Sequence, residues 1–155
     1  MKGITGFAFF LLFLAGFALV NLRSVGEQKA ASVAVPSAAA LAAWEWRLLE
    51  STQDDLDGDL DIRLTFAEDL GLFVQGACNR FSGTYAMHDG LFTASALAGT
   101  RRACRNEVMQ SDTSLLQVLD ETRHVQITGR RLALLNAAGE SLASFTAAER
   151  AAENR

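Results

Sequence analysis

Positive charge is scarce in this chain, which has 14 Lys and Arg residues against 18 Asp and Glu. Between Trp44 and Thr146 the imbalance is larger, with nine basic and fifteen acidic side chains and a net charge of −6. A protein that binds nucleic acid through the phosphates needs a basic surface. The composition therefore argues against nucleic acid as a partner.

The sequence also lacks the common signatures of enzymes. It has no G-x-S-x-G, no phosphate-binding glycine loop and no H-E-x-x-H, so the usual motifs of hydrolases and nucleotide-binding proteins are absent. We therefore expect no enzymatic activity, no catalytic residue and no cofactor.

Charge is missing altogether from Ile4 to Val20, a run of seventeen residues preceded by Lys2. A positive flank followed by an apolar core is typical of export signals. Such a run forms about 26 Å of helix, close to the lower limit for crossing a hydrocarbon core of about 30 Å. We expect residues 1–26 to form a hydrophobic helix, either cleaved beyond Ser24 as a signal peptide or kept as a signal anchor. The alternative, a buried helix of a cytosolic protein, is disfavoured by the absence of a polar face.

The same segment predicts a location. We expect the rest of the chain to be periplasmic, or anchored in the cytoplasmic membrane and facing the periplasm. Residues 4–20 would contact the membrane if they are not cleaved. The nearest cysteine after the apolar run is Cys78, so no cysteine stands where a lipid is attached, and we do not expect a lipoprotein.

Residues 27–43 are expected to form a linker, because Ala and Ser dominate them and they contain the only proline, Pro36. An alternative is that Ala38 to Ala43 form a short helix packed on the domain, since Ala has the highest helix propensity. The folded domain is expected over residues 44–146, followed by a polar tail over residues 147–155.

The domain is predicted to be mostly β. In short runs, apolar and polar residues alternate, which is typical of strands with one buried face. The runs cover residues 44–48, 60–66, 72–74, 81–87, 92–96, 125–127, 132–134 and 142–145. His88, Asp89 and Gly90 supply a hairpin turn between two of these runs. We expect about eight antiparallel strands in a small curved sheet or a partly open barrel.

One stretch departs from this alternation. Apolar positions recur every three or four residues between Asn106 and Glu121, in a pattern that also contains Asp112. This periodicity predicts one amphipathic helix, capped by Asn106 or Ser111. We expect the helix to plug an end of the sheet or to cover an open edge.

Two motifs stand out once the strands are placed. The first runs from Gly76 to Tyr85 as GACNRFSGTY, and the second from Leu97 to Cys104 as LAGTRRAC. Together they resemble the META domain family of HslJ-like bacterial exported heat-shock proteins. The residues that match the family pattern are Trp46, Cys78, Asn79, Phe81, Gly83, Tyr85, Thr100, Arg101, Cys104, Leu132 and Leu134. The chain departs from the pattern at Ala77, Arg102 and Arg105.

The resemblance implies a fold more than a function, because the family is linked to envelope stress and drug tolerance without an established enzymatic activity. We expect a non-enzymatic exported domain that binds an envelope protein or a small ligand, or serves as a stress-related accessory protein. The alternative is a carrier that holds a small apolar ligand in a cavity inside the curved sheet. A dry pocket of at least about 300 Å³ inside the sheet would favour the carrier.

Cys78 and Cys104 are the only cysteines. In an exported domain such a pair is expected to form a disulfide, and the register of both motifs in the family supports this pairing. One alternative is a zinc site with His88 and His124, although the spacings match no compact zinc motif. Another is a cysteine nucleophile paired with one of the histidines, which a disulfide would preclude.

Aspartates are concentrated at one place in the sequence, at positions Asp54, Asp55, Asp57, Asp59 and Asp61. They fail the EF-hand pattern, because counting from Asp55 the sixth residue is Leu60 and the twelfth is Phe66. We expect a solvated turn around Asp57 that leads into a strand, rather than a calcium site.

The remaining polar motif residues are expected to hold loops. The amide of Asn79 is predicted to bond its own backbone in a turn, and Thr100 and Arg101 to pin the loop before Cys104. Arg101, Arg102 and Arg105 form the densest positive charge in the chain. They are either a solvated face or a possible anion-binding site.

Overall fold

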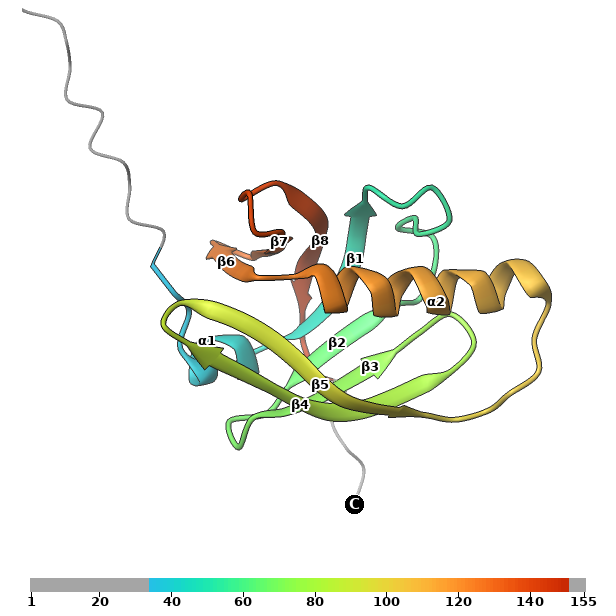
Figure 1. Cartoon of the computed structure of the whole chain (residues 1–155), viewed down its shortest axis with the longest axis horizontal. Coiled ribbons are helices and arrows are strands. Elements are labelled where there is room, and N and C mark those ends of the chain that lie inside the picture. Colours follow the sequence, from blue (N-terminus) through green and yellow to red (C-terminus); the bar gives the residue numbers. More distant parts are fainter. Residues whose placement is uncertain (1–33, 151–155) are drawn as a thin grey trace, which may run out of the picture. The chain divides into compact units, whose positions relative to one another are not determined.

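The computed structural model describes residues 34–150, and Figure 1 shows their course. The helices are α1 (Ala38–Ala42) and α2 (Asn106–Glu121). The strands are β1 (Glu45–Ser51), β2 (Arg63–Phe66), β3 (Gly71–Gln75), β4 (Arg80–His88), β5 (Leu91–Gly99), β6 (His124–Thr128), β7 (Arg131–Leu135) and β8 (Ser141–Ala148). Neither helix of this part of the chain has the length and hydropathy needed to cross a membrane.

All eight strands belong to one antiparallel sheet in the order β5-β4-β3-β2-β1-β8-β7-β6. Neighbours in space are neighbours in sequence except where β1 pairs with β8. The sheet is curved but not closed, so it is not a complete barrel. Its edges, β5 and β6, approach each other, and the Phe92 N–H donates to the carbonyl of Arg123 at 2.7 Å.

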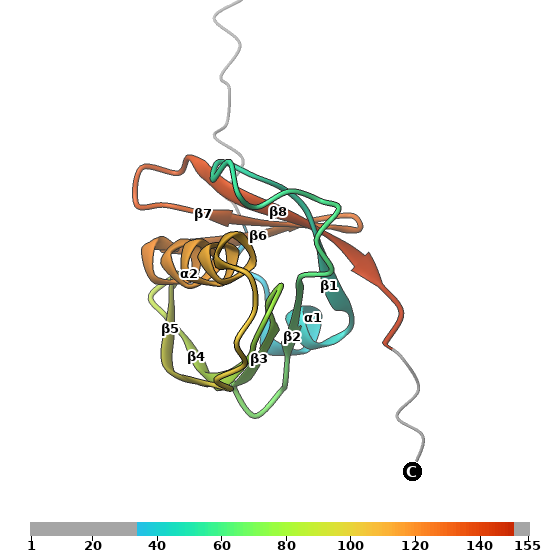
Figure 2. The same ribbon diagram turned by 90° about the vertical axis from the view of Figure 1, so that its right-hand side faces the viewer.

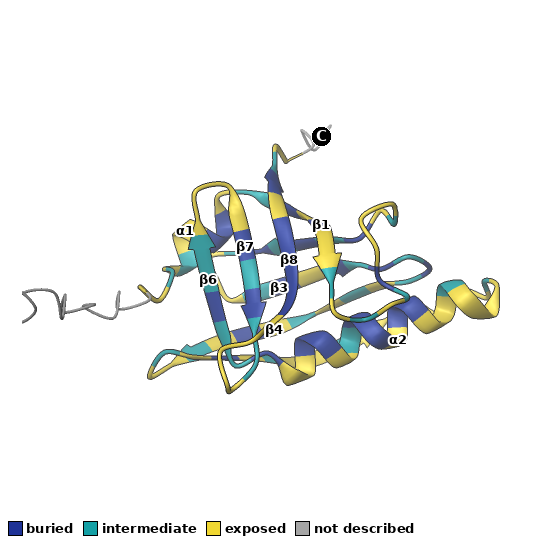
Figure 3. Ribbon diagram, turned by 90° about the horizontal axis from the view of Figure 1, so that it is seen from above, coloured by how far each residue is buried: buried dark blue, intermediate teal, exposed yellow. Residues whose placement is uncertain are grey.

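Helix α2 packs against the sheet beside its open side. Figure 2 shows it between β5 and the β6–β7 hairpin. Its buried face includes Leu115, Val118 and Leu119, and in Figure 3 buried and exposed residues alternate along the helix. The helix covers the sequence range predicted from the periodicity. Its expected cap is wrong, because Arg105 is the N-cap and no side chain bonds there, while the Ser111 hydroxyl donates to the carbonyl of Asp55 at 2.8 Å.

Aromatic rings fill the inside of the curved sheet. The largest fully buried side chains include Trp46, Phe66, Tyr85, Phe92 and Phe145. The Phe66 ring meets the Tyr85 ring edge to face with 5.1 Å between centroids, an arrangement that aromatic pairs favour. The space in which a carrier would hold its ligand is thus occupied by packed side chains, which counts against the carrier.

The domain is longer at both ends than the alternation of residues indicates. Residues 38–42 form α1 rather than a linker, which confirms the alternative of a short helix packed on the domain. Leu41 is fully buried, and its carbonyl accepts a hydrogen bond from Trp46 Nε1 at 2.9 Å. At the other end, β8 runs to Ala148, and the Arg150 guanidinium donates to the carbonyl of Phe66 at 2.8 Å. The prediction that a polar tail begins at residue 147 is therefore wrong, because β8 continues to Ala148.

Three expectations concern other parts of the chain. The signal peptide or anchor over residues 1–26, the first part of the linker at 27–33 and the end of the tail at 151–155 lie outside the described residues.

Candidate functional site

A buried carboxylate connects the first motif to helix α2. Asp112 is 4% exposed, and its two oxygens accept hydrogen bonds from three N–H groups. The donors are the backbone amides of Cys78 at 3.1 Å and Asn79 at 2.8 Å, and the side-chain Nδ2 of Asn79 at 3.0 Å. Asp112 thus ties the segment before β4 to α2.

The other end of the Asn79 amide holds the second motif. Asn79 Oδ1 accepts from the Thr100 hydroxyl and from the Arg102 backbone N–H, both at 2.8 Å. The Thr100 hydroxyl oxygen in turn accepts from the Arg80 N–H at 3.2 Å. Asn79 therefore joins three segments distant in sequence, rather than closing a turn on its own backbone as expected. Thr100 pins the loop as predicted, whereas Arg101 makes no side-chain hydrogen bond among residues 34–150.

This arrangement explains the two glycines of the first motif. A Cβ at Gly76 would lie 2.2 Å from Asp112 Oδ1, and a Cβ at Gly83 would lie 2.5 Å from the carbonyl oxygen of Ser95. Both distances are shorter than real Cβ contacts. The first motif thus leaves room for the carboxylate and for the neighbouring strand β5.

The expected disulfide between Cys78 and Cys104 is present. Their Cα atoms are 6.2 Å apart, within the range that a disulfide spans without backbone movement. The bond joins the residue before Asn79 to the residue before Arg105, the N-cap of α2. Both sulfurs are used in it, so they are not available as zinc ligands or as a nucleophile in this state.

The histidines and aspartates considered above are dispersed. His88 pairs with Asp89 at 2.9 Å on the surface. The described residues contain no cluster of three or more His, Cys, Asp or Glu suited to a metal. In the aspartate-rich stretch, Asp57 Oδ1 accepts from the Asp59 N–H, as in the expected turn, and Asp55 Oδ2 accepts from the Ser114 hydroxyl.

Arg101, Arg102 and Arg105 are all exposed. Within the part of the chain that the structure describes, none of the three forms an ion pair. Their anion-binding role stays a prediction.

A groove lies on the outer face of the sheet. The alternation of residues in the sequence did not predict it. Its volume is about 580 Å³. It crosses the strands β1 to β5 and is lined by Glu45, Arg63, Thr65, Phe73, Val74, Gln75, Arg80, Phe81, Ser82, Ala98, Gly99 and Thr100. We call it the outer-face groove. Only the register between strands shows that these residues share one surface.

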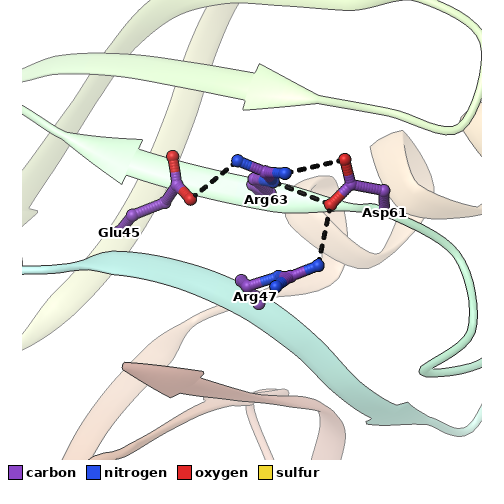
Figure 4. Close-up of polar contacts among 4 residues, drawn as sticks. All are labelled: Glu45, Arg47, Asp61 and Arg63. Atoms are coloured by element: carbon purple, nitrogen blue, oxygen red, sulfur yellow. Dashed lines mark hydrogen bonds and ion pairs between the residues drawn. The ribbon is translucent and has the colours of Figure 1, made fainter. Parts of the chain in front are cut away.

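An ion-pair network forms the β1–β2 end of this groove. Arg63 lies between two carboxylates, bonding Asp61 through Nε at 2.7 Å and Glu45 through Nη1 at 3.0 Å. Arg47 also contacts Asp61, at 3.1 Å, as Figure 4 shows. The hydrogen bond from Arg63 and the positive charges of both arginines hold the pKa of Asp61 below its usual value, although partial desolvation opposes them.

Because the pKa of Asp61 is lowered by folding, the network should stabilise the protein at neutral pH and lose that effect as the pH falls through the folded pKa. Asp61 is 50% exposed, so we expect Asp61→Asn to cost only about 0.5–1 kcal/mol of unfolding free energy at neutral pH. Urea unfolding from about pH 7 to about pH 2 measures this. The difference from the wild type should vanish at the acid end, and Asp59→Asn should show no comparable effect. A difference independent of pH would contradict the assignment.

Comparison with known proteins identifies the same family that the two motifs resemble. The META domain family model matches residues 39–149. The chain belongs to the META domain family. The match begins inside α1 and ends one residue beyond β8, so it covers most of α1 and all of β8.

Relatives of this META domain include the heat shock protein HslJ of Escherichia coli, which is 38% identical over 61 residues. The matched stretch spans 39% of this chain and 44% of HslJ. A protein from Burkholderia xenovorans with an NMR structure is 23% identical with a TM-score of 0.59, covering 79% of this chain and 97% of that one. A DUF4847 family protein from Bacteroides vulgatus is 11% identical with a TM-score of 0.54, covering 72% and 96%. At these identities the two structures show that the fold is shared.

Proposed function

We propose that this META domain is an exported envelope protein that acts by binding rather than by catalysis. It works in the periplasm, free or held at the cytoplasmic membrane by residues 4–20. Its partner is an envelope protein or a small ligand. The name of its relative HslJ, a heat shock protein, supports a stress-related accessory role.

The observation that carries export is the Cys78–Cys104 disulfide. Disulfides form and persist in oxidising compartments and are rare in the cytosol. This bond joins the two motifs that identify the family, and the uncharged run from Ile4 to Val20 supplies an export signal of the appropriate kind. Both observations support the same compartment independently.

The polar motif residues support a binding role without catalysis. The Asn79 amide and the Thr100 hydroxyl are hydrogen-bonded within the fold, and the Asp112 carboxylate is buried with three donors. A general acid or base needs a group within hydrogen-bond reach of the substrate. These residues instead build the domain. Within residues 34–150 the outer-face groove offers an open concave surface of a size suited to a ligand.

An alkaline phosphatase fusion after Ala43 tests the export. We expect the fusion to be active in a bacterial host, because this phosphatase requires an oxidising compartment to form its disulfides. The same fusion without residues 1–26 should be inactive. An inactive full fusion that is expressed at the same level would refute export, and N-terminal sequencing of the active one shows whether the segment is cleaved.

A further inference from the structure

The outer-face groove has the dimensions of a small-molecule site. Its volume of about 580 Å³ lies inside the range of about 300–1,000 Å³ that is usual for such sites. Side chains such as Thr65, Phe73 and Ser82 project from the face opposite the aromatic core. Leu64 and Leu72, which precede Thr65 and Phe73 on their strands, are fully buried on the other face. The groove is therefore open to a ligand without disturbing the core.

An exposed aromatic ring contributes apolar surface to the groove. Phe73 is 53% exposed. Its cross-strand neighbours are small, Thr65 on β2 and Ser82 on β4, and Ser82 is in turn opposite Ala98 on β5. The one large side chain on this row, Glu45 opposite Thr65, is two strands away, so no large side chain is paired directly with the ring. Such a ring is suited to stacking against another flat apolar group.

One cation of the groove is available to a ligand. Arg63, at the β1–β2 end, is engaged by two carboxylates. Arg80 forms no ion pair among residues 34–150. Gln75 lies between them, because it is paired with Arg63 on β2 and with Arg80 on β4. An anionic group is thus favoured at the Arg80 end, and the Glu45 carboxylate disfavours it at the other.

We propose that the outer-face groove binds a small aromatic anion. The flat ring of the ligand stacks on Phe73, and its carboxylate or sulfonate accepts hydrogen bonds from the Arg80 guanidinium, with the Gln75 amide as a further donor. Arginine is suited to such a group because its planar N–H donors match the two oxygens. This ligand class rests on the proposed binding role and specifies the site that performs it.

Two fluorescent probes separate the ring from the charge. Anilinonaphthalene sulfonate is an aromatic anion, and phenylnaphthylamine has the same rings without the sulfonate. The protein without residues 1–33 is titrated with each, after circular dichroism has verified that it folds. We expect the sulfonate to bind at least about tenfold more tightly, which corresponds to one charge-assisted hydrogen bond.

Three variants locate the site. Arg80→Gln should weaken sulfonate binding by about tenfold and leave amine binding unchanged. Phe73→Thr, which keeps a residue suited to a strand, should weaken both probes by about fivefold. The control is Arg131→Gln, which removes an exposed arginine of β7 outside the groove and should change neither affinity.

The outcomes are distinct. Equal affinity for both probes, or unchanged sulfonate binding by Arg80→Gln, would overturn the assignment of an anion site. Absence of sulfonate binding at millimolar concentration would overturn the groove as a site for aromatic anions. Because the fusion after Ala43 measures export separately, an exported and folded protein that fails to bind would refute the ligand class without refuting the proposed function.

Discussion

Removal of the Cys78–Cys104 disulfide should lower the free energy of unfolding by about 2–5 kcal/mol, as is typical of small exported domains. The cysteines are 26 residues apart, and closing a loop of that length is worth about 3.5 kcal/mol in the chain-entropy model. A domain of this size has a total stability of about 5–15 kcal/mol. The bond therefore supplies a large share of it. Urea unfolding of the wild type and of the double variant C78A/C104A measures the loss.

Reduction provides the matched control. Reducing the wild type should produce a similar loss, because it removes the same constraint. The reductant should have no effect on C78A/C104A, which has no disulfide to break. A double variant as stable as the oxidised wild type would contradict the structural role of the bond.

Asp112→Ala should cost about 3 kcal/mol of unfolding free energy. The substitution removes the acceptor of three N–H groups in a buried position. Each buried donor that loses its partner costs about 1–3 kcal/mol, and the smaller value applies where water can reach it, as at the partly exposed Asn79. Asp112→Asn should also destabilise, because its amide N–H₂ must face one of these donors. Urea unfolding at neutral pH measures both variants.

Asp120→Ala is the control for Asp112→Ala. Asp120 lies on the same helix, is exposed, and its carboxylate accepts no hydrogen bond within residues 34–150. The control therefore includes the gain in helix propensity from Asp to Ala without the loss of buried acceptors. We expect it to change stability by less than about 0.5 kcal/mol. Equal effects of the two substitutions would show that the buried cluster does not stabilise the fold.

The secondary structure could be predicted from local patterns. Period-two alternation, as in Leu64 and Phe66 of β2, indicated the eight strands, because each strand has one face in the core. Three- and four-residue spacing indicated α2 over its full length. The two ends of the domain were harder to predict. Leu41 becomes buried only by packing on the domain, and Arg150 finds the carbonyl of Phe66, its hydrogen-bond acceptor, only in a strand far away in the sequence.

The functional features depend on contacts that local patterns do not encode. Asp112 stood on the apolar face of the predicted helix, which is a signal of a buried acceptor, but its donors come from a segment more than thirty residues earlier. The outer-face groove required the register of five strands. Phe73 illustrates the difficulty, because in sequence it is one apolar residue between the buried Leu72 and Val74, and the alternation assigns it to the outer face without showing its neighbours.

The thiol state of the two cysteines in living cells tests the account most directly, because it depends both on export and on formation of the disulfide. The full chain is expressed in a bacterial host, treated with a thiol-alkylating reagent under denaturing conditions, and analysed by mass. We predict that Cys78 and Cys104 remain unmodified unless a reductant is added first, and that both become reactive when residues 1–26 are deleted and the protein stays in the cytosol. Two modified cysteines in the full-length protein without reductant would contradict an exported domain held by this bond.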